Sequence, residues 1–304
     1  MQATVNVNGR VSDAEHAVIP VFDHGFLYGE GVYETLRTYN GRPFLFDRHL
    51  ARLRASAGML QLDVPLTDAQ LAERVDATVE AAGLGAHAAA GSRDAYIRIL
   101  LTRGVGELTY DPSACPTPSV VVIVKEFVAP PARLFDMGVS VALVSVLRNH
   151  PGSLNPLIKS NNLLNNAMAM QEALRRGAFE GIMRNYRGEL AECTQSNVFI
   201  VRNGEALTPP LDAGLLAGIT RQFVFEIGRD AGIGVREAVL HDADLFAADE
   251  VFLTSTTREV LPIVRVDDRT IGTGQPGPVS RRLLAAFRDK ASALTQAAAA
   301  PSAH

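Results

Sequence analysis

Lysine is rare in this chain, so each lysine is a candidate for chemistry that arginine cannot perform. The chain has 29 lysine and arginine residues, and its lysines are Lys125, Lys159 and Lys290. A guanidinium stays protonated, whereas a lysine amine can lose its proton and act as a nucleophile. Where a solvated positive charge is enough, this sequence uses arginine, and its lysine positions are therefore informative.

Lys159 is the strongest of the three candidates. It lies in Asn155-Pro-Leu-Ile-Lys-Ser-Asn-Asn, between a predicted strand and a predicted helix. A lysine amine removed from water at such a junction would be a Schiff-base nucleophile. The alternative is a surface lysine near a helix start. Lys125 ends a very apolar strand and Lys290 lies in a charged terminal helix, so we expect neither to be catalytic.

Four other features could bind an anion or a ring. A helix beginning at Gly218-Ile-Thr would offer free backbone amides and the positive end of its dipole to a phosphate. The cluster Thr254-Ser-Thr-Thr257 follows a strand, and it could bind an anion or form an ordinary turn. Glu192 is expected in a polar, otherwise uncharged loop before a buried strand, where it could face a ring nitrogen or be an ordinary loop carboxylate in a turn. Arg52 lies at the edge of an apolar helix face and could point inward or to solvent.

Strands and helices are mixed without strict alternation, which predicts an α+β fold of two domains rather than a doubly wound sheet. The turn residues Asn40-Gly41 predict a hairpin, and Thr67-Asp-Ala-Gln70 predicts a capping box. The strands expected from apolar alternation or apolar runs are 2–7, 32–39, 43–46, 95–102, 119–125, 139–147, 180–185, 197–202, 235–239 and 250–253. The expected helices begin near 47, 67, 161, 218 and 278.

A double proline at Pro130-Pro131 marks the expected boundary between the domains. We therefore predict a small N-terminal α/β domain over 1–125, a linker over 126–137 and a larger C-terminal domain over 138–290. The alanine-rich end, 291–304, is predicted to be disordered.

Composition narrows the class of protein. The chain has 304 residues, 47% of them hydrophobic and 20% charged, which is enough to bury a full core. A net charge of -4 argues against a nucleic-acid partner. No apolar run reaches the roughly 20 residues needed to span a bilayer, and no signal peptide is visible. Cys115 and Cys193 give no disulfide framework or metal spacing. We expect a cytoplasmic enzyme with neither a metal nor a membrane or nucleic-acid partner.

Together these motifs resemble the class IV, or fold-type IV, pyridoxal-phosphate aminotransferases. That family includes branched-chain aminotransferases, D-amino-acid aminotransferases and aminodeoxychorismate lyases. The resemblance runs from about Val5 to Phe287 and implies a small N-terminal domain and a larger C-terminal domain with a barrel-like sheet. The matching stretches are 23–37, 49–53, 158–160, 192–199, 216–221 and 248–257.

The resemblance also implies pyridoxal 5'-phosphate as the cofactor and a role for each motif. Lys159 would bind the cofactor as a Schiff base and move a proton, Glu192 would bind the pyridine nitrogen, and Leu216 would pack on the ring. Arg52 would hold the phosphate together with the start of the helix at Gly218 and with Thr256. The implied cofactor-binding residues are Arg52, Lys159, Glu192, Leu216, Gly218, Ile219, Thr220, Thr256 and Thr257.

Substrate residues follow from the same resemblance. Amides around Thr257 and Arg258 would bind the α-carboxylate. Arg98 would pair with the side-chain carboxylate of glutamate or 2-oxoglutarate, as a bidentate arginine can. The implied substrate-binding residues are Tyr28, Tyr33, Tyr96, Arg98, Thr257 and Arg258.

These features favour a ping-pong transfer between branched-chain L-amino acids and 2-oxoglutarate, in the biosynthesis of branched-chain amino acids, by a homodimer or higher homo-oligomer. Two segments depart from related patterns. Leu163 and Leu164 stand where branched-chain enzymes usually carry a tyrosine, and Leu108 and Tyr110 replace the Arg-x-His pair of D-amino-acid aminotransferases. A D-amino-acid or (R)-amine transaminase and an aminodeoxychorismate lyase remain the alternatives.

Overall fold

Two units, each built around one sheet, make up the chain. The computed structural model describes residues 2–85 and 93–296. The first unit comprises Met1–Val128 with Arg288–His304, and the second comprises Ala129–Phe287. The α+β class and the two sheet-bearing units expected from the sequence are confirmed.

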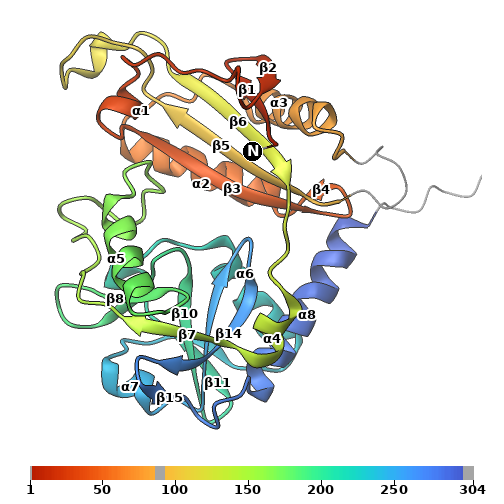
Figure 1. The fold of residues 1–304 in the computed structure, drawn as a ribbon, viewed down its shortest axis with the longest axis vertical. Coiled ribbons are helices and arrows are strands. Elements are labelled where there is room, and N and C mark those ends of the chain that lie inside the picture. Colours follow the sequence, from red (N-terminus) through yellow and green to blue (C-terminus); the bar gives the residue numbers. More distant parts are fainter. Residues whose placement is uncertain (1, 86–92, 297–304) are drawn as a thin grey trace, which may run out of the picture. The chain divides into compact units, whose positions relative to one another are not determined.

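The first unit carries an antiparallel six-stranded sheet in the order β2-β1-β6-β5-β3-β4 (Figure 1). Its strands are β1 (Thr4–Val7), β2 (Arg10–Asp13), β3 (Gly31–Tyr39), β4 (Arg42–Pro43), β5 (Ala95–Thr102) and β6 (Ser119–Glu126). Its helices are α1 (His24–Leu27), α2 (Phe46–Met59), α3 (Asp68–Ala81) and the 3₁₀ turn η1 (Pro112–Ala114), with the end of α8.

Strand alternation gives this sheet two different faces. Leu36 and Ile97 are cross-strand partners and fully buried, on the face where α2 contacts β3. Tyr33, Tyr96 and Arg98 point to the opposite face and are half-buried. Successive side chains of a strand point to opposite faces of the sheet. One face therefore packs in the apolar core, and the other carries three predicted substrate residues.

Local signals at the helix and hairpin ends are largely confirmed. Asn40 and Gly41 have φ of 53° and 74°, as a two-residue hairpin turn requires. The Thr67 hydroxyl accepts from the Gln70 amide at 3.2 Å, and the capping box is complete. Asp47 is not the helix cap that its residue type suggests, because α2 begins at Phe46 and places Asp47 within the first turn.

The second unit carries a nine-stranded sheet that curls on itself. Its order is β12-β11-β10-β13-β14-β7-β8-β9, with β15 paired to β14. The terminal strand β9 also contacts β10, which gives the half-barrel shape. The strands are β7 (Val139–Leu143), β8 (Gly181–Arg184), β9 (Leu190–Cys193), β10 (Asn197–Arg202), β11 (Glu205–Thr208), β12 (Val235–Glu237), β13 (Glu250–Ser255), β14 (Glu259–Val266) and β15 (Arg269–Thr270).

Aromatic pairs join neighbouring strands and neighbouring helices of this unit. Phe199 and Phe252 stack at 4.9 Å between ring centroids, and Phe223 on α6 meets Phe287 on α8 edge to face at 5.3 Å. α6 contacts β12 and β13. The helices are α4 (Ala132–Met137), α5 (Leu164–Arg175), η2 (Leu211–Ala213), α6 (Ile219–Asp230), α7 (Asp242–Phe246) and α8 (Pro278–Thr295).

Two predicted boundary segments contain regular structure. The expected linker, 126–137, includes α4, which begins directly after the double proline. The disorder predicted from residue 291 is wrong for 291–295, because α8 continues to Thr295 with Ala291 fully buried. Residues 297–304 lie outside the described part. Within the described residues, no helix combines the length and apolar character needed to cross a membrane.

Candidate active site

Lys159 lies in the long connection between β7 and α5, and its side chain is half-buried. Hydrogen bonds hold the backbone on both sides of it. The Ile158 amide donates to the Asn155 carbonyl at 3.0 Å, and the Asn162 amide donates to the Ser160 hydroxyl at 3.0 Å. The helix expected from residue 161 begins at Leu164 instead. Lys159 therefore lies on a loop held by hydrogen bonds rather than at a helix start.

Glu192 is a buried strand residue, which corrects the expectation of a polar loop. It lies in β9 opposite Met183 of β8 and is 5% exposed. Its carboxylate accepts from Arg148 Nε at 2.7 Å and from the Leu216 amide at 3.1 Å. A carboxylate buried with such donors can serve as an acceptor for a cationic ring N–H. Leu216, predicted to pack on the ring, is thus tied directly to Glu192.

Asn197 connects the predicted pieces of the second unit. Its Nδ2 donates to the Leu216 carbonyl at 3.0 Å and lies 3.4 Å from Glu192 Oε2. A Cβ added at Gly218 would lie 2.0 Å from Asn197 Oδ1. Across the sheet, Asn197 pairs in register with Thr254. Glu192, Leu216, Gly218 and the threonine cluster are therefore neighbours around one amide side chain.

The start of α6 offers backbone donors as predicted. Gly218 is the N-cap residue, with φ -65° and ψ 134°, and no side chain caps the helix. The first amides of a helix, here those of Ile219 and Thr220, have no intrahelical acceptor. Together with the helix dipole they form a site suited to a phosphate.

Unsatisfied oxygens gather at the end of β13 and beside Lys159. Among the described residues, the Thr254 and Ser255 hydroxyls and the Asn161 side-chain oxygen are buried without a hydrogen-bond partner. Thr256 and Thr257 follow in the tight turn to β14 and are half-buried. Buried polar atoms normally have partners, so orphans at this turn are consistent with a bound polar group.

The Arg258 side chain is hydrogen-bonded to the buried carboxylate of Glu180. Its Nη1 donates to Glu180 Oε2 at 2.7 Å and to the Ser196 hydroxyl at 3.2 Å, and its Nη2 donates to Gln195 Oε1 at 2.8 Å. Burial raises the pKa of Glu180, and the Arg258 charge opposes that rise. The side chain of Arg258 thus fixes the β13–β14 turn, and its backbone amide donates to the Ser255 carbonyl at 3.3 Å within that turn.

Arg52, in the first unit, points inward rather than to solvent. Its Nε and Nη2 donate to the two oxygens of Glu34 at 2.7 and 2.8 Å, and His49 Nδ1 lies 2.7 Å from Glu34 Oε2. Burial opposes ionisation of Glu34, but the charges and hydrogen bonds of Arg52 and His49 outweigh it and hold the Glu34 pKa well below its ordinary value. Arg52 is therefore held rigidly by its own helix and by β3.

Cations stack on tyrosines along the half-buried face of the six-stranded sheet. The Arg98 guanidinium carbon lies 4.1 Å from the centroid of the Tyr33 ring, and Lys125 Nζ lies 4.9 Å from that of Tyr96. Stacking fixes a guanidinium plane while leaving its edge able to donate to a carboxylate. Tyr33, Tyr96 and Arg98, predicted as substrate residues, share this face.

Tyr28 lies in a separate aromatic group of the same unit. Its ring meets His24 edge to face at 4.8 Å and Tyr110 at 5.1 Å. Tyr110 and Leu108 are strongly exposed on the loop after β5. Tyr28 is thus next to the loop whose sequence departs from the D-amino-acid aminotransferase pattern.

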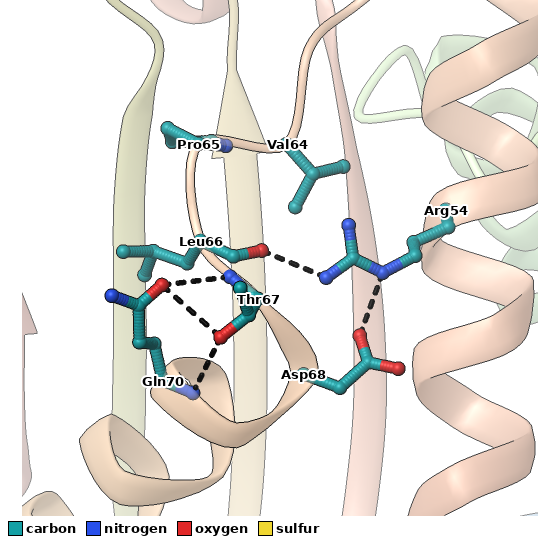
Figure 2. A pocket seen from close by; sticks show the side chains of 7 residues that line it. All are labelled: Arg54, Val64, Pro65, Leu66, Thr67, Asp68 and Gln70. Atoms are coloured by element: carbon teal, nitrogen blue, oxygen red, sulfur yellow. Dashed lines mark hydrogen bonds and ion pairs between the residues drawn. The ribbon is translucent and has the colours of Figure 1, made fainter.

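A surface hollow at the start of α3 contains none of the predicted site residues (Figure 2). Arg54 crosses it and donates to Asp68 Oδ1 at 2.6 Å and to the Leu66 carbonyl at 2.7 Å. Thr67 and Gln70 complete the capping box at its edge. Because these polar groups already satisfy one another, the hollow belongs to the structure of the α2–α3 connection.

Four residues of these networks have no counterpart in the predicted set. Glu34, Arg148, Glu180 and Asn197 each hold a predicted residue in place. Glu34 alone carried a sequence signal, since a carboxylate in the middle of an apolar strand needs a buried partner. The other three act across 19 to 78 residues of sequence, and no local pattern marks such pairs.

Comparisons with known proteins identify the family. The profile of the amino-transferase class IV family matches residues 31–266. A Methanocaldococcus jannaschii protein named "Putative branched-chain-amino-acid aminotransferase" is 38% identical over 285 residues, covering 94% of this chain and 95% of that protein. The D-alanine aminotransferase of Bacillus licheniformis is 33% identical over 282 residues, covering 93% of this chain and 95% of that protein. The crystal structure of a T.th. branched-chain amino acid aminotransferase with pyridoxamine 5'-phosphate matches with a TM-score of 0.89 at 29% identity, covering 96% of this chain and 95% of that chain.

The half-barrel unit carries a lysine on a hydrogen-bonded loop, a buried carboxylate and a helix start without a side-chain cap. This chain belongs to the class IV aminotransferase family. The residues present fit pyridoxal phosphate. Glu192 would accept from the ring nitrogen, the start of α6 and the unsatisfied hydroxyls of Thr254 and Ser255 suit the phosphate, and Lys159 would supply a primary amine.

Proposed function

We propose that this protein transfers an amino group between branched-chain L-amino acids and 2-oxoglutarate, with pyridoxal phosphate bound covalently to Lys159. The observation that carries the proposal is the linked arrangement of Glu192, Leu216, Asn197 and Gly218 in the same unit as this lysine. The similarity to a branched-chain aminotransferase structure over nearly the full chain supports it.

Pyridoxal phosphate, when bound, supplies an electron sink for the negative charge left when an amino acid loses its α-proton. Lys159 Nζ would carry that proton from the α-carbon to C4′ of the cofactor in the first half-reaction and back in the second. Glu192 binds the ring N–H and keeps the ring cationic. The Leu216 side chain would pack against the ring and exclude water from it, with the Leu216 backbone held by the bond from its amide to Glu192 Oε2.

Three groups of this chain would hold the phosphate. The amides of Ile219 and Thr220 and the Thr256 hydroxyl would donate to it from the second unit. Arg52 would add a guanidinium from the first unit, oriented by Glu34. A phosphate bound in this way anchors the cofactor independently of its bond to Lys159, so the cofactor stays in place while the lysine acts as a base.

Substrate recognition is assigned to two places. The amides of Thr257 and Arg258, in a turn braced by Glu180, would bind the α-carboxylate. In the first unit, Tyr28, Tyr33 and Tyr96 would form the apolar part of the substrate site, and Arg98 would bind the second carboxylate of glutamate or 2-oxoglutarate. The Tyr33 ring fixes the Arg98 guanidinium plane before substrate binds.

Half-reactions of the loaded enzyme test the function. We expect L-leucine and L-glutamate to remove the visible absorbance of bound pyridoxal phosphate and to leave pyridoxamine phosphate, which 2-oxoglutarate should convert back. Borohydride reduction and peptide mapping should label Lys159, and the Lys159→Ala variant should lose both label and turnover. An unlabelled Lys159 in wild-type protein would refute the proposal.

Arg98→Ala tests the dicarboxylate assignment. We expect the KM for glutamate and 2-oxoglutarate to rise at least tenfold, because a charged hydrogen bond of about 1.5–3 kcal/mol is lost, with a smaller change for leucine. Arg265→Ala, which removes an exposed arginine paired with Asp268, is the matched control. Equal losses for leucine and glutamate would make Arg98 a structural residue only.

The second candidate is a D-amino-acid aminotransferase, favoured by the 33% identity to a D-alanine aminotransferase. Against it, Leu108 and Tyr110 offer no cationic carboxylate anchor in the loop after β5. Reaction with D-alanine or (R)-1-phenylethylamine but not L-leucine would select a D-amino-acid or amine transaminase. Release of pyruvate from aminodeoxychorismate without amino transfer would select the lyase.

We also propose that the protein acts as a homodimer or a larger homo-oligomer. Support comes from the exposed apolar side chains of the first unit, where Phe22, Phe26, Leu108 and Tyr110 are at least half exposed. Light scattering of the loaded enzyme should give at least twice the 32.6 kDa chain mass. A monomer that remains fully active would contradict this assignment.

A further inference from the structure

The acceptor sites of the Glu192 carboxylate are unequally used. Oε2 accepts from the Leu216 amide at 3.1 Å and from Asn197 Nδ2 at 3.4 Å, whereas Oε1 accepts from Arg148 Nε at 2.7 Å. A carboxylate has about four lone-pair sites, two on each oxygen. Both sites of Oε2 are therefore occupied, and one site of Oε1 remains for a further donor.

Arg148 is held as firmly as the carboxylate that it contacts. Its side chain is 9% exposed, and its Nη1 donates to Asn165 Oδ1 at 3.1 Å. The backbone amide of Arg148 donates to the Arg184 carbonyl at 2.8 Å, and Asn165 Nδ2 donates to the Leu147 carbonyl at 2.8 Å. If the guanidinium turned away from Glu192, it would lose its bonds to both Glu192 Oε1 and Asn165 Oδ1.

We propose that Arg148 is a positioning residue that aims Oε1 of Glu192 at the pyridine nitrogen and weakens the hold of that oxygen on the ring proton. The proposal rests on the proposed function, in which Glu192 is the partner of the ring nitrogen. Two cations then share one buried carboxylate, so each is held less strongly than it would be alone. Arg148 thereby moderates the electron sink without touching the cofactor.

Solution NMR of the holoenzyme loaded with pyridoxal phosphate labelled with ¹⁵N at the ring nitrogen tests this role directly. In Arg148→Met the ring N–H becomes the one cation on Glu192, so we expect the ¹⁵N resonance to move toward the pyridinium position. Arg148→Lys, which keeps a cation, should return it toward the wild-type position. No movement in a folded, loaded Arg148→Met protein, or movement toward neutral pyridine, would overturn the proposal.

A second variant covers the case in which Arg148→Met does not fold. Asn165→Asp places a carboxylate on Nη1 of Arg148, which should draw the guanidinium charge away from Glu192 and move the resonance in the same direction. An unmoved resonance in that variant would also refute the role of Arg148.

Glu192→Gln separates this inference from the proposed function. If Lys159 is not labelled by borohydride, or if Glu192→Gln leaves the ring nitrogen resonance unchanged, the proposed function fails. If Glu192→Gln moves the resonance and the Arg148 variants do not, the proposed function stands and only the role of Arg148 is lost.

Discussion

Replacement of Gly218 by alanine tests whether the start of α6 and the Glu192 carboxylate are mechanically linked. The backbone of Gly218, with φ -65°, is open to any L-residue, so the substitution causes no backbone strain. Its new Cβ would lie 2.0 Å from Asn197 Oδ1 and 3.3 Å from Arg221 Cβ. The cost is therefore steric and falls mainly on Asn197.

The size of the effect follows from these contacts. Asn197 must move by at least about 1 Å, because Cβ contacts below 3.0 Å are essentially never seen. That movement breaks its bond to the Leu216 carbonyl, now 3.0 Å, for about 1 kcal/mol. Crowding in a packed region adds about 1–3 kcal/mol. We expect Gly218→Ala to lower the free energy of unfolding by about 2–4 kcal/mol.

Urea denaturation of the apoprotein, with a double-mutant cycle, measures this effect. Gly58→Ala in α2 is the control, because nothing lies within 4 Å of its added Cβ, and it should be neutral or stabilising by up to about 1 kcal/mol. In the Asn197→Ala background, Gly218→Ala should cost less than about 0.5 kcal/mol, since the clashing oxygen is gone. An equal cost in both backgrounds would refute the steric link between Gly218 and Asn197.

Three further predictions concern buried ionisable groups. Glu34→Gln should lower the free energy of unfolding by about 3–5 kcal/mol, because it breaks the buried pair with Arg52. The control Asp68→Asn, in the exposed pair with Arg54, should lower it by at most about 1 kcal/mol. Equal urea midpoints for the two variants would contradict this prediction. The Glu34 pKa is held below its ordinary value of 4.5, so the stability that the ionised Glu34 contributes is present above pH 4.5 and is lost as the pH falls below that value. Acid unfolding monitored by circular dichroism should therefore be steeper in wild type than in Glu34→Gln. Burial raises the thiol pKa of Cys115 and Cys193, so both should react with a disulfide reagent only after unfolding, and fast labelling of the native protein would be inconsistent with this.

Short-range patterns in the sequence were sufficient for the elements and for the outline of the site. The Thr67 capping box, the Asn40-Gly41 turn and the strand over 95–102 depend on neighbours within a few residues, and all three are confirmed. The rarity of lysine in the sequence marks Lys159 as a candidate for chemistry that arginine cannot perform. Such features can be predicted because backbone hydrogen bonding and side-chain direction repeat regularly along a helix or a strand.

The tertiary structure decided which side chains hold the predicted ones. Glu192 reads as a loop residue because its strand is four residues long and becomes a strand only by pairing with β8. Arg148 reaches Glu192 from the connection after β7, and Asn197 reaches it from the start of β10. A buried carboxylate must find its donors wherever the folded chain supplies them, and the free energy of that choice depends on burial and distance in space. Neither burial nor distance in space can be obtained from the order of the residues alone.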